Sequence, residues 1–475
     1  MSDSVEGRWA EIFTPRYATV TLILCLGVAL LAFNAFLASI SLPTAVEELG
    51  GVALISWALT LFLVFAIVGG AGAALFKQRL GARTALLVSA GVFLLGTVIA
   101  ATATSMPQVL VGRAIQGLGE GVVSAICFAL IPELFPSRLV PKVFGLQAMI
   151  WAIAAFGGPA AAGLLTELVS WRAAFLVNVP LVLIFAAMVM VKVPAHTPGE
   201  KKAVARFPGL RLFTIGAAIM LVALASLVTP LPAAALLVAS ALLLVGAVWM
   251  DGRALQRLMP RDAFRTSSVV GTGLWVVLLI NIAGAGSAVY LVLVVQQMWG
   301  FGPAAAGALA AVLAVTWSVS SITVANVSSK ETRKTLIRLG PGLIGAGLLL
   351  VLLGLQFDQV AIVIFGQMII GAGYGIHNSY LNLTMMEAAT DSERDRASAL
   401  IPTTQSAGNA IGAALAGVAA NSAGLAAAAS TAAIKFALVP IYILGAVTAA
   451  LAVLAAWRMV SLVRPQDANS SFAAG

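Results

Sequence analysis

Charged residues are scarce in this sequence, and their scarcity excludes most classes of soluble protein. Asp, Glu, Lys and Arg make up 9% of the 475 residues, whereas hydrophobic residues make up 61%. A water-soluble domain has about 25% charged residues, which it needs to cover its surface. A lipid bilayer is an apolar solvent and removes that requirement. We therefore expect an integral membrane protein.

Cysteine and histidine are also rare, with two residues of each. Cys25 and Cys127 lie inside apolar runs without partners at metal-ligand spacing, which argues against a disulfide framework or a zinc site. The chain has no phosphate-binding loop and no Ser/His/Asp set outside the apolar runs, so we expect no enzyme, no cofactor and no ATP-driven pump. The first apolar run has the length of a membrane span and no cleavage site, which indicates an uncleaved helix.

Long apolar runs are abundant. A helix needs about 20 apolar residues to cross a bilayer, whereas a barrel strand needs about ten residues of alternating polarity. The runs here are long and apolar all round, so we predict an all-α polytopic membrane protein. Fourteen spans are expected, near residues 18–42, 53–76, 84–104, 107–132, 142–168, 173–191, 212–229, 231–250, 266–295, 304–326, 336–356, 359–385, 397–420 and 432–457.

The predicted spans are grouped as six, two and six. Residues 1–192 would form an N-terminal six-helix bundle and residues 266–475 a pseudo-symmetric C-terminal one, with a cavity between them. Residues 193–265 would supply cytoplasmic linkers and two additional helices. This middle pair has almost no polar residue, so we expect it to pack on the outside and carry no chemistry.

Positive charges lie mostly on one side of the predicted spans. Of the 27 Lys and Arg residues, 24 fall on that side, and the exceptions are Arg113, Arg172 and Lys435. Basic residues gather in cytoplasmic loops of membrane proteins, so both termini are predicted to be cytoplasmic in a bacterial inner membrane. The net charge of +9 is therefore explained by topology, and we expect the lipid bilayer, not nucleic acid, as partner.

Glu120 is the strongest functional candidate, because it lies near the middle of the fourth span. An acid at that depth is costly and is usually functional, which makes Glu120 a candidate proton carrier. The alternative is a protonated structural group bonded to a neighbouring helix. Arg113 and Gln116 share its helix face, and Gln116 or water could bridge Arg113 to Glu120 across about 10 Å. Arg113 could equally be structural, bonding carbonyl groups of a facing helix.

Further polar residues interrupt the other spans, where such groups either line a cavity or bond helices together. His377 could titrate near neutral pH, although a lone histidine is more often structural. Lys435 is expected to reach the lipid headgroups. The candidate cavity residues, beside Arg113 and Gln116, are Asn34, Gln147, Trp151, Asn281, Tyr374, His377, Asn378 and Gln405; Gln367 and Asn409 belong to the same class.

Four motifs resemble those of the major facilitator superfamily, and most closely its fourteen-span drug/proton antiporter branch. They read RLGAR at 79–83, RAIQGLGEG at 113–121, AAFGGPAAAG at 154–163 and WRAAFLVNVP at 171–180. The resemblance implies a secondary transporter that works as a monomer. It also implies a conformational role for Arg79, Gly81 and Arg83, which would clamp helix ends, and for Gly157, Gly158, Pro159 and Gly163, which would form a hinge or seal. The alternative for Arg79 and Arg83 is that they only contribute to the positive charge of the cytoplasmic loops. The alternative for the glycine-rich motif is ordinary helix packing.

Two departures from the family pattern matter. Gln78 stands where the family usually has an Asp before Arg79, and Asn34 stands where the branch often has an acid, within NAFLASISLP at 34–43. Proton coupling through position 34 is therefore excluded, whereas coupling elsewhere stays open; Glu120 is the site we expect, and His377 and Lys435 remain alternatives.

We thus expect a transporter that exports small organic compounds, amphiphilic or toxic ones among them, in exchange for protons by alternating access. A transporter of the same fold for an organic anion, a nutrient or a lipid-like substrate is the alternative, because Arg113, His377 and Lys435 outnumber the single acid. A non-transporting sensor or scaffold would need neither the buried acid nor the glycine-rich motif.

Overall fold

The computed structural model describes residues 9–136, 139–193, 208–254, 257, 259–324, 327 and 329–463, and all regular structure in these residues is helical. Short 3-10 turns lie at Trp9–Phe13, Val52–Leu54 and Leu425–Ala427. The α-helices are α1 (Ala18–Leu49), α2 (Ile55–Ala101), α3 (Met106–Leu134), α4 (Val140–Leu168), α5 (Trp171–Leu176), α6 (Asn178–Lys192), α7 (Gly209–Ala225), α8 (Pro230–Gly252), α9 (Val269–Trp299), α10 (Pro303–Val324), α11 (Lys330–Gln356), α12 (Val360–Ala388), α13 (Asp391–Ser422) and α14 (Thr431–Leu462).

A helix overlaps each predicted span, with two differences in how the spans are divided. Helix α7 ends at Ala225, before the predicted end at residue 229. The second and third spans both lie in α2, which reverses at Gly81, where φ is 77°. Glycine adopts this left-handed conformation without the steric cost that a Cβ atom would bring. The sixth span is divided into α5 and α6. Ten helices among the described residues are long and apolar enough to cross a membrane, with Val52–Ala101 counted as one.

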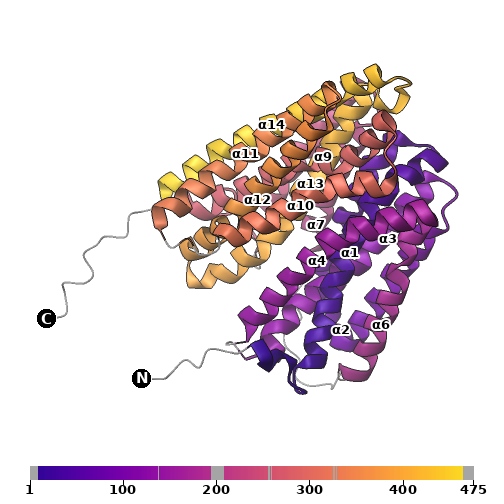
Figure 1. The fold of residues 1–475 in the computed structure, drawn as a ribbon. Helices are drawn as coiled ribbons and strands as arrows, with labels where there is room; N and C mark the ends of the chain where they lie inside the picture. The colour runs from indigo at the N-terminus through magenta and orange to yellow at the C-terminus, as the bar shows by residue number, and fades with distance from the viewer. Residues whose placement is uncertain are drawn as a thin grey trace.

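The helices form two groups, α1–α6 and α9–α14 (Figure 1). We call the end where α1 begins and α14 ends the terminal end, and the opposite end the joined end. Figure 1 shows the two groups in contact at the joined end and diverging toward the terminal end. The main contacts between the groups are made by α4 with α10 and by α2 with α13.

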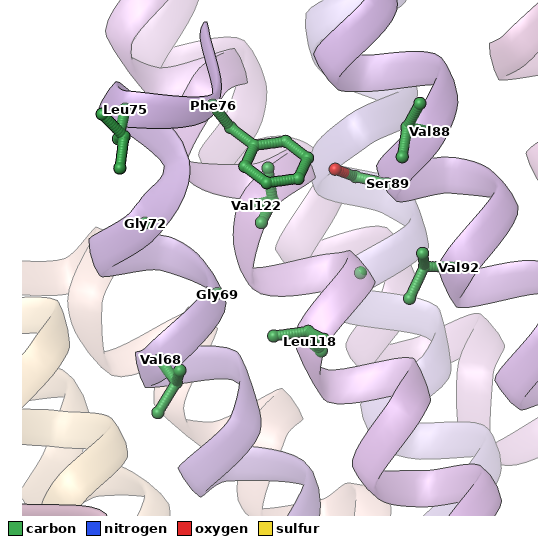
Figure 2. Close-up of a pocket in the computed structure, with 11 residues that line it drawn as sticks. Val68, Gly69, Gly72, Leu75, Phe76, Val88, Ser89, Val92, Leu118 and Val122 are labelled. Atoms are coloured by element: carbon green, nitrogen blue, oxygen red, sulfur yellow. The ribbon is translucent and has the colours of Figure 1, made fainter. Parts of the chain in front are cut away.

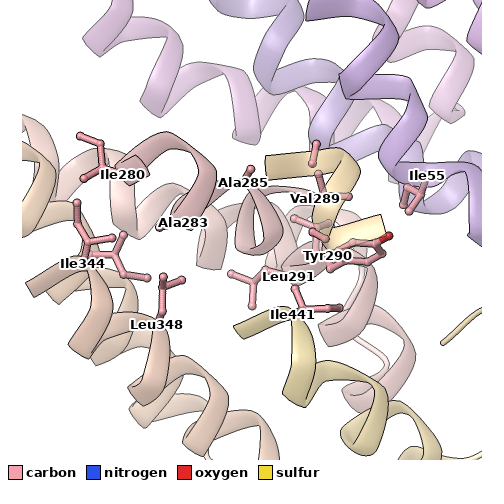
Figure 3. Packing of buried hydrophobic residues seen from close by; sticks show 14 of the residues in the cluster. Ile55, Ile280, Ala283, Ala285, Val289, Tyr290, Leu291, Ile344, Leu348 and Ile441 are labelled. Carbon is pink, nitrogen blue, oxygen red and sulfur yellow. The ribbon is translucent and has the colours of Figure 1, made fainter. Parts of the chain in front are cut away.

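One apolar core continues across both groups at the joined end. Figure 3 shows Tyr290 of the second group close to Ile55 at the start of α2, with Ile441 beyond Tyr290. Tyr290 is fully buried, and all three residues belong to one cluster that also contains Leu37 and Ile40 of α1. Buried apolar side chains of both groups are therefore in one cluster at the joined end.

Small residues bring the two groups together. A Cβ atom at Gly163 of α4 would lie 2.5 Å from the Cα atom of Ala304 in α10. A Cβ atom at Gly307 would lie 3.2 Å from the carbonyl oxygen of Pro159. Gly158 instead faces Phe36 of α1, and Gly157 has only an ordinary contact with Phe33. Of the predicted hinge residues, Gly163 and Pro159 thus lie at the contact between the groups.

The middle pair departs from the expectation that it packs outside. Several large side chains of α8, such as Leu231 and Leu242, are exposed. In contrast, α7 lies against both α2 and α13, where Ile219 packs with Val64 and Ala410. The composition of α7 did not distinguish lipid from protein neighbours, because both are apolar.

Arg172 and Trp171 connect α5 to α1 at the joined end. Arg172 Nη1 donates to Glu48 Oε1 at 2.7 Å, and Trp171 Nε1 donates to Glu48 Oε2 at 2.7 Å. The hydrogen bonds from Arg172 and Trp171 lower the pKa of Glu48 below its ordinary 4.5. The WRAAFLVNVP motif therefore begins with a structural connection between helices.

We expect Glu48→Gln to destabilise the protein slightly at pH 7. A lowered pKa in the folded state contributes stability above pH 4.5, and that contribution is lost as the pH falls through the folded value. Thermal unfolding of the wild type and the variant should therefore differ at pH 7 and converge in acid. Glu47→Gln is the control, since Glu47 makes no hydrogen bond with a described residue. A difference that grows in acid would contradict this account.

We expect Gly163→Leu to separate the two groups at the joined end, because no side chain fits against Ala304. Spin labels at Leu168 and Phe357, which are 77% and 67% exposed, would report this as longer distances. Gly157→Ala is the matched control in the same helix and should leave the distances unchanged. Identical distributions in Gly163→Leu and the wild type would refute the close contact.

Candidate functional site

Glu120, Gln116 and Arg113 form the centre of a buried polar network. The i, i+3, i+7 spacing places the three side chains on one face of α3. Their exposed fractions are 2%, 0% and 1%. Helix α3 contacts both α1 and α2, which supply the partners of these side chains. The sequence-based grouping of the three residues is consistent with this geometry.

Asn34 of α1 connects Arg113 to Glu120. Its Nδ2 atom donates to Glu120 Oε2 at 3.1 Å, while its Oδ1 atom accepts from Arg113 Nη1 at 3.5 Å and from Asn178 Nδ2 at 3.4 Å. Because two donors converge on Oδ1, the amide group is oriented with Nδ2 toward the carboxyl group. Gln116 or water was the bridge considered from the sequence, but Asn34 occupies this position.

Gln116 holds Arg113 from another side. Arg113 Nη1 donates to Gln116 Oε1 at 2.8 Å, and Gln116 Nε2 donates to Thr97 Oγ1 at 2.9 Å. The guanidinium group also donates to the Ala58 carbonyl oxygen at 3.4 Å and lies 4.1 Å from the centre of the Phe62 ring. A facing carbonyl group was the structural role considered for Arg113, so the side chain combines that role with its place in the network.

Glu120 itself is incompletely bonded. Its Oε2 atom accepts from Asn34, but its Oε1 atom is buried without a hydrogen-bond partner. An ionised oxygen without a donor in apolar surroundings is costly. The carboxyl group is therefore placed where gaining or losing a proton changes its interactions strongly.

Asn178 and Thr97 belong to this network but were not singled out in the sequence. Asn178 lies in the WRAAFLVNVP motif, and a polar residue inside an apolar span is a signal that could have identified it. Thr97 gave no comparable signal, because threonine hydroxyls in helices commonly bond their own backbone, as Thr97 also does to Phe93.

The candidates in the second group of helices lie apart from Glu120 and bond within their own group. Tyr374 donates to the Ile280 carbonyl oxygen at 2.8 Å and stacks on Trp317. His377 Nδ1 lies 2.6 Å from the Gly373 carbonyl oxygen, while Nε2 is buried without a partner. Asn281 donates to the Val277 carbonyl oxygen in its own helix.

The remaining candidates differ in environment. Gln147 is buried with both amide atoms unpartnered, whereas Trp151, four residues later, is 39% exposed. Lys435 pairs with Asp358 at the joined end. Three side chains are partly buried or buried without a network of their own: Asn378, Gln405 and Gln367. No group of three metal-ligating side chains is present among the described residues.

We expect Asn34→Ala to lower the free energy of unfolding by about 2 kcal/mol, because each interhelical hydrogen bond in a membrane protein contributes about 0.6 to 1.7 kcal/mol. Denaturant unfolding in micelles, followed by tryptophan fluorescence, would measure this change. Asn409→Ala is the control, since Asn409 makes no hydrogen bond with a described residue. Equal losses in the two variants would show that the Asn34 bridge contributes nothing.

Comparisons with known proteins agree with this architecture. The chain is 32% identical over 433 residues to a probable multidrug-efflux transporter of Mycobacterium tuberculosis (strain CDC 1551 / Oshkosh), which covers 88% of this chain and 91% of the relative. A POT family transporter in complex with 5-aminolevulinic acid shares the fold with a TM-score of 0.67 at 15% identity, over 94% and 96% of the two chains.

A D-xylose-proton symporter has the same fold, with a TM-score of 0.66 at 18% identity over 92% of this chain and 97% of that one. These two likenesses concern the fold alone. The model of the Major Facilitator Superfamily matches residues 24–413, which is most of the chain. The chain therefore belongs to the Major Facilitator Superfamily, whose members are membrane transporters and not enzymes.

Proposed function

We propose that this protein is a fourteen-span proton-coupled antiporter that exports small organic compounds, with Glu120 as the proton site. The observation that carries the proposal is the buried, half-bonded carboxyl group of Glu120, linked to Arg113 through Asn34. The probable multidrug-efflux transporter among its relatives supports export as the direction.

The distribution of charge supports an orientation. Basic side chains such as Lys77, Arg79 and Lys192 lie at the terminal end, whereas the acids Glu48 and Glu167 lie at the joined end. By the positive-inside rule the terminal end faces the cytoplasm of a bacterial cell. The described conformation, in which the groups meet at the joined end, is then the one open to the cytoplasm, and the bundles 1–192 and 266–475 are the two halves that alternate.

Protonation of Glu120 changes the charge of the network. With an ionised Glu120, the positive charge of Arg113 is balanced across the Asn34 bridge. With a protonated Glu120, Arg113 remains as an uncompensated charge within the bundle, which is costly in apolar surroundings. A proton and a cationic compound therefore compete, and this competition is what exchange requires. The protein would carry out this cycle as a monomer.

A substrate of opposite charge is the second candidate. When Glu120 is neutral, the same Arg113 would attract an organic anion, a nutrient carboxylate or a lipid-like headgroup. Transport assays that compare cationic, neutral and anionic compounds distinguish the two, because protons and an anion would move in the same direction.

We expect Glu120→Gln to abolish transport driven by a pH gradient in proteoliposomes while leaving the binding and exchange of neutral compounds, which need no charge on Glu120. The amide can still accept from Asn34 but cannot release a proton. Glu387→Gln is the control, because Glu387 is exposed near the terminal end of α12. If the Glu120 variant pumped at the wild-type rate, Glu120 would not be the proton site.

A further inference from the structure

An apolar groove opens on the side of the first group of helices. It has a volume of about 280 Å³ and lies between the two halves of α2 and helix α3. Figure 2 shows the ring of Phe76 reaching from the first half of α2 toward Val122, with Val88 and Val92 on the opposite wall. Ser89 has the single side-chain hydroxyl among the lining residues, so the groove offers a ligand almost no polar groups to bind.

Close packing through glycine shapes the groove. A Cβ atom at Gly69 would lie 2.3 Å from the Leu118 carbonyl oxygen, and one at Gly119 would lie 2.5 Å from the Ser89 carbonyl oxygen. Helix α3 therefore lies directly on both halves of α2 and forms the floor. Phe76 and Val88 are 40% and 44% exposed, so the walls open toward the surroundings of the protein.

The groove is separate from the Glu120 network. Leu118 and Gly119 line it, whereas the Glu120 side chain bonds Asn34 of α1. The groove thus has no carboxyl group and no amide with which to select an exported compound.

Two cationic side chains lie where the groove ends. Arg79 and Arg83 are in the reversal between the two halves of α2, and neither makes a hydrogen bond or ion pair with a described residue. Arg79 follows Phe76 by three residues and Arg83 precedes Val88 by five, which corresponds to about 5 and 8 Å along a helix. Both charges are therefore within reach of a headgroup whose chain enters the groove.

We propose that this groove is a binding site for an anionic phospholipid of the leaflet at the terminal end. One acyl chain lies between the two halves of α2, and the phosphate group binds Arg79 and Arg83. The apolar walls match a hydrocarbon chain, and the two unpaired cations match a headgroup with net negative charge. A zwitterionic lipid would fill the groove but would gain less from the two arginines.

Native mass spectrometry of the full chain, titrated with phosphatidylglycerol or phosphatidylcholine, tests the proposal. We expect the wild type to prefer phosphatidylglycerol by about tenfold or more, since each surface cation contributes about 1 kcal/mol toward an anionic lipid. Arg79→Gln with Arg83→Gln should remove that preference. Lys192→Gln is the control, because Lys192 is a basic residue at the terminal end of α6. This variant should retain the preference.

Larger side chains in the groove test separately whether an acyl chain binds there. Val88→Phe with Val92→Phe should weaken the binding of both lipids. Leu95→Phe with Val98→Phe, on the same helix but outside the groove, should leave the binding of both lipids unchanged. Equal binding of the two lipids by the wild type, or an unchanged preference in the arginine variant, would overturn the proposal. The proposal would also be overturned if an apolar compound displaced lipid from the groove and bound the wild type and the arginine variant equally well. The occupant of the groove would then be a substrate.

Discussion

The amide group of Asn34 is the contact on which the polar interior of the first bundle depends. Among the residues that the structure describes, it is the one side chain that hydrogen-bonds both Arg113 and Glu120, and it also accepts from Asn178. Four helices therefore meet through a few buried side chains. A different arrangement of α1, α2, α3 and α6 would leave these polar atoms unpaired inside an apolar bundle, which is costly. The network therefore favours the observed arrangement.

The absence of an acid in the first span gives this network its particular character. An Asp at position 34 would place a second carboxyl group about 3 Å from Glu120, and two such groups could not both ionise. Asn34 instead donates to one oxygen of Glu120 and leaves the other without a partner. The network therefore contains one carboxyl group with one unpartnered oxygen, not a pair of coupled acids.

Packing at the joined end complements this chemistry. Gly163 and Ala304 bring α4 and α10 into backbone contact, and Glu167 of α4 accepts from the Ala304 backbone amide at 3.4 Å. These contacts join the two groups through backbone atoms and one carboxyl group. The neighbouring α7 contacts both groups, because its apolar side chains pack against α2 and α13.

Local sequence patterns were sufficient to place the helices, because in a bilayer every backbone group must be bonded within its own segment and span length is set by lipid thickness. The loop between the second and third spans and the approximate ends of the helices followed from the charge pattern and the apolar runs, whereas the reversal at Gly81 came from the structure. Glu120, Arg113 and Gln116 could be grouped from their spacing on one helix. The count of fourteen spans and the sidedness of the membrane stay predictions.

The partners of those side chains required the tertiary structure. Asn34 and Asn178 are 86 and 58 residues from Glu120 in the sequence, and no local pattern says which span faces which. The position of α7 against both groups was missed for a related reason: an apolar helix surface is the same whether lipid or protein covers it. The sequence thus determined which segments are helical and buried in the membrane, whereas only the packed fold decided which polar atoms meet, because those contacts depend on distances across helices.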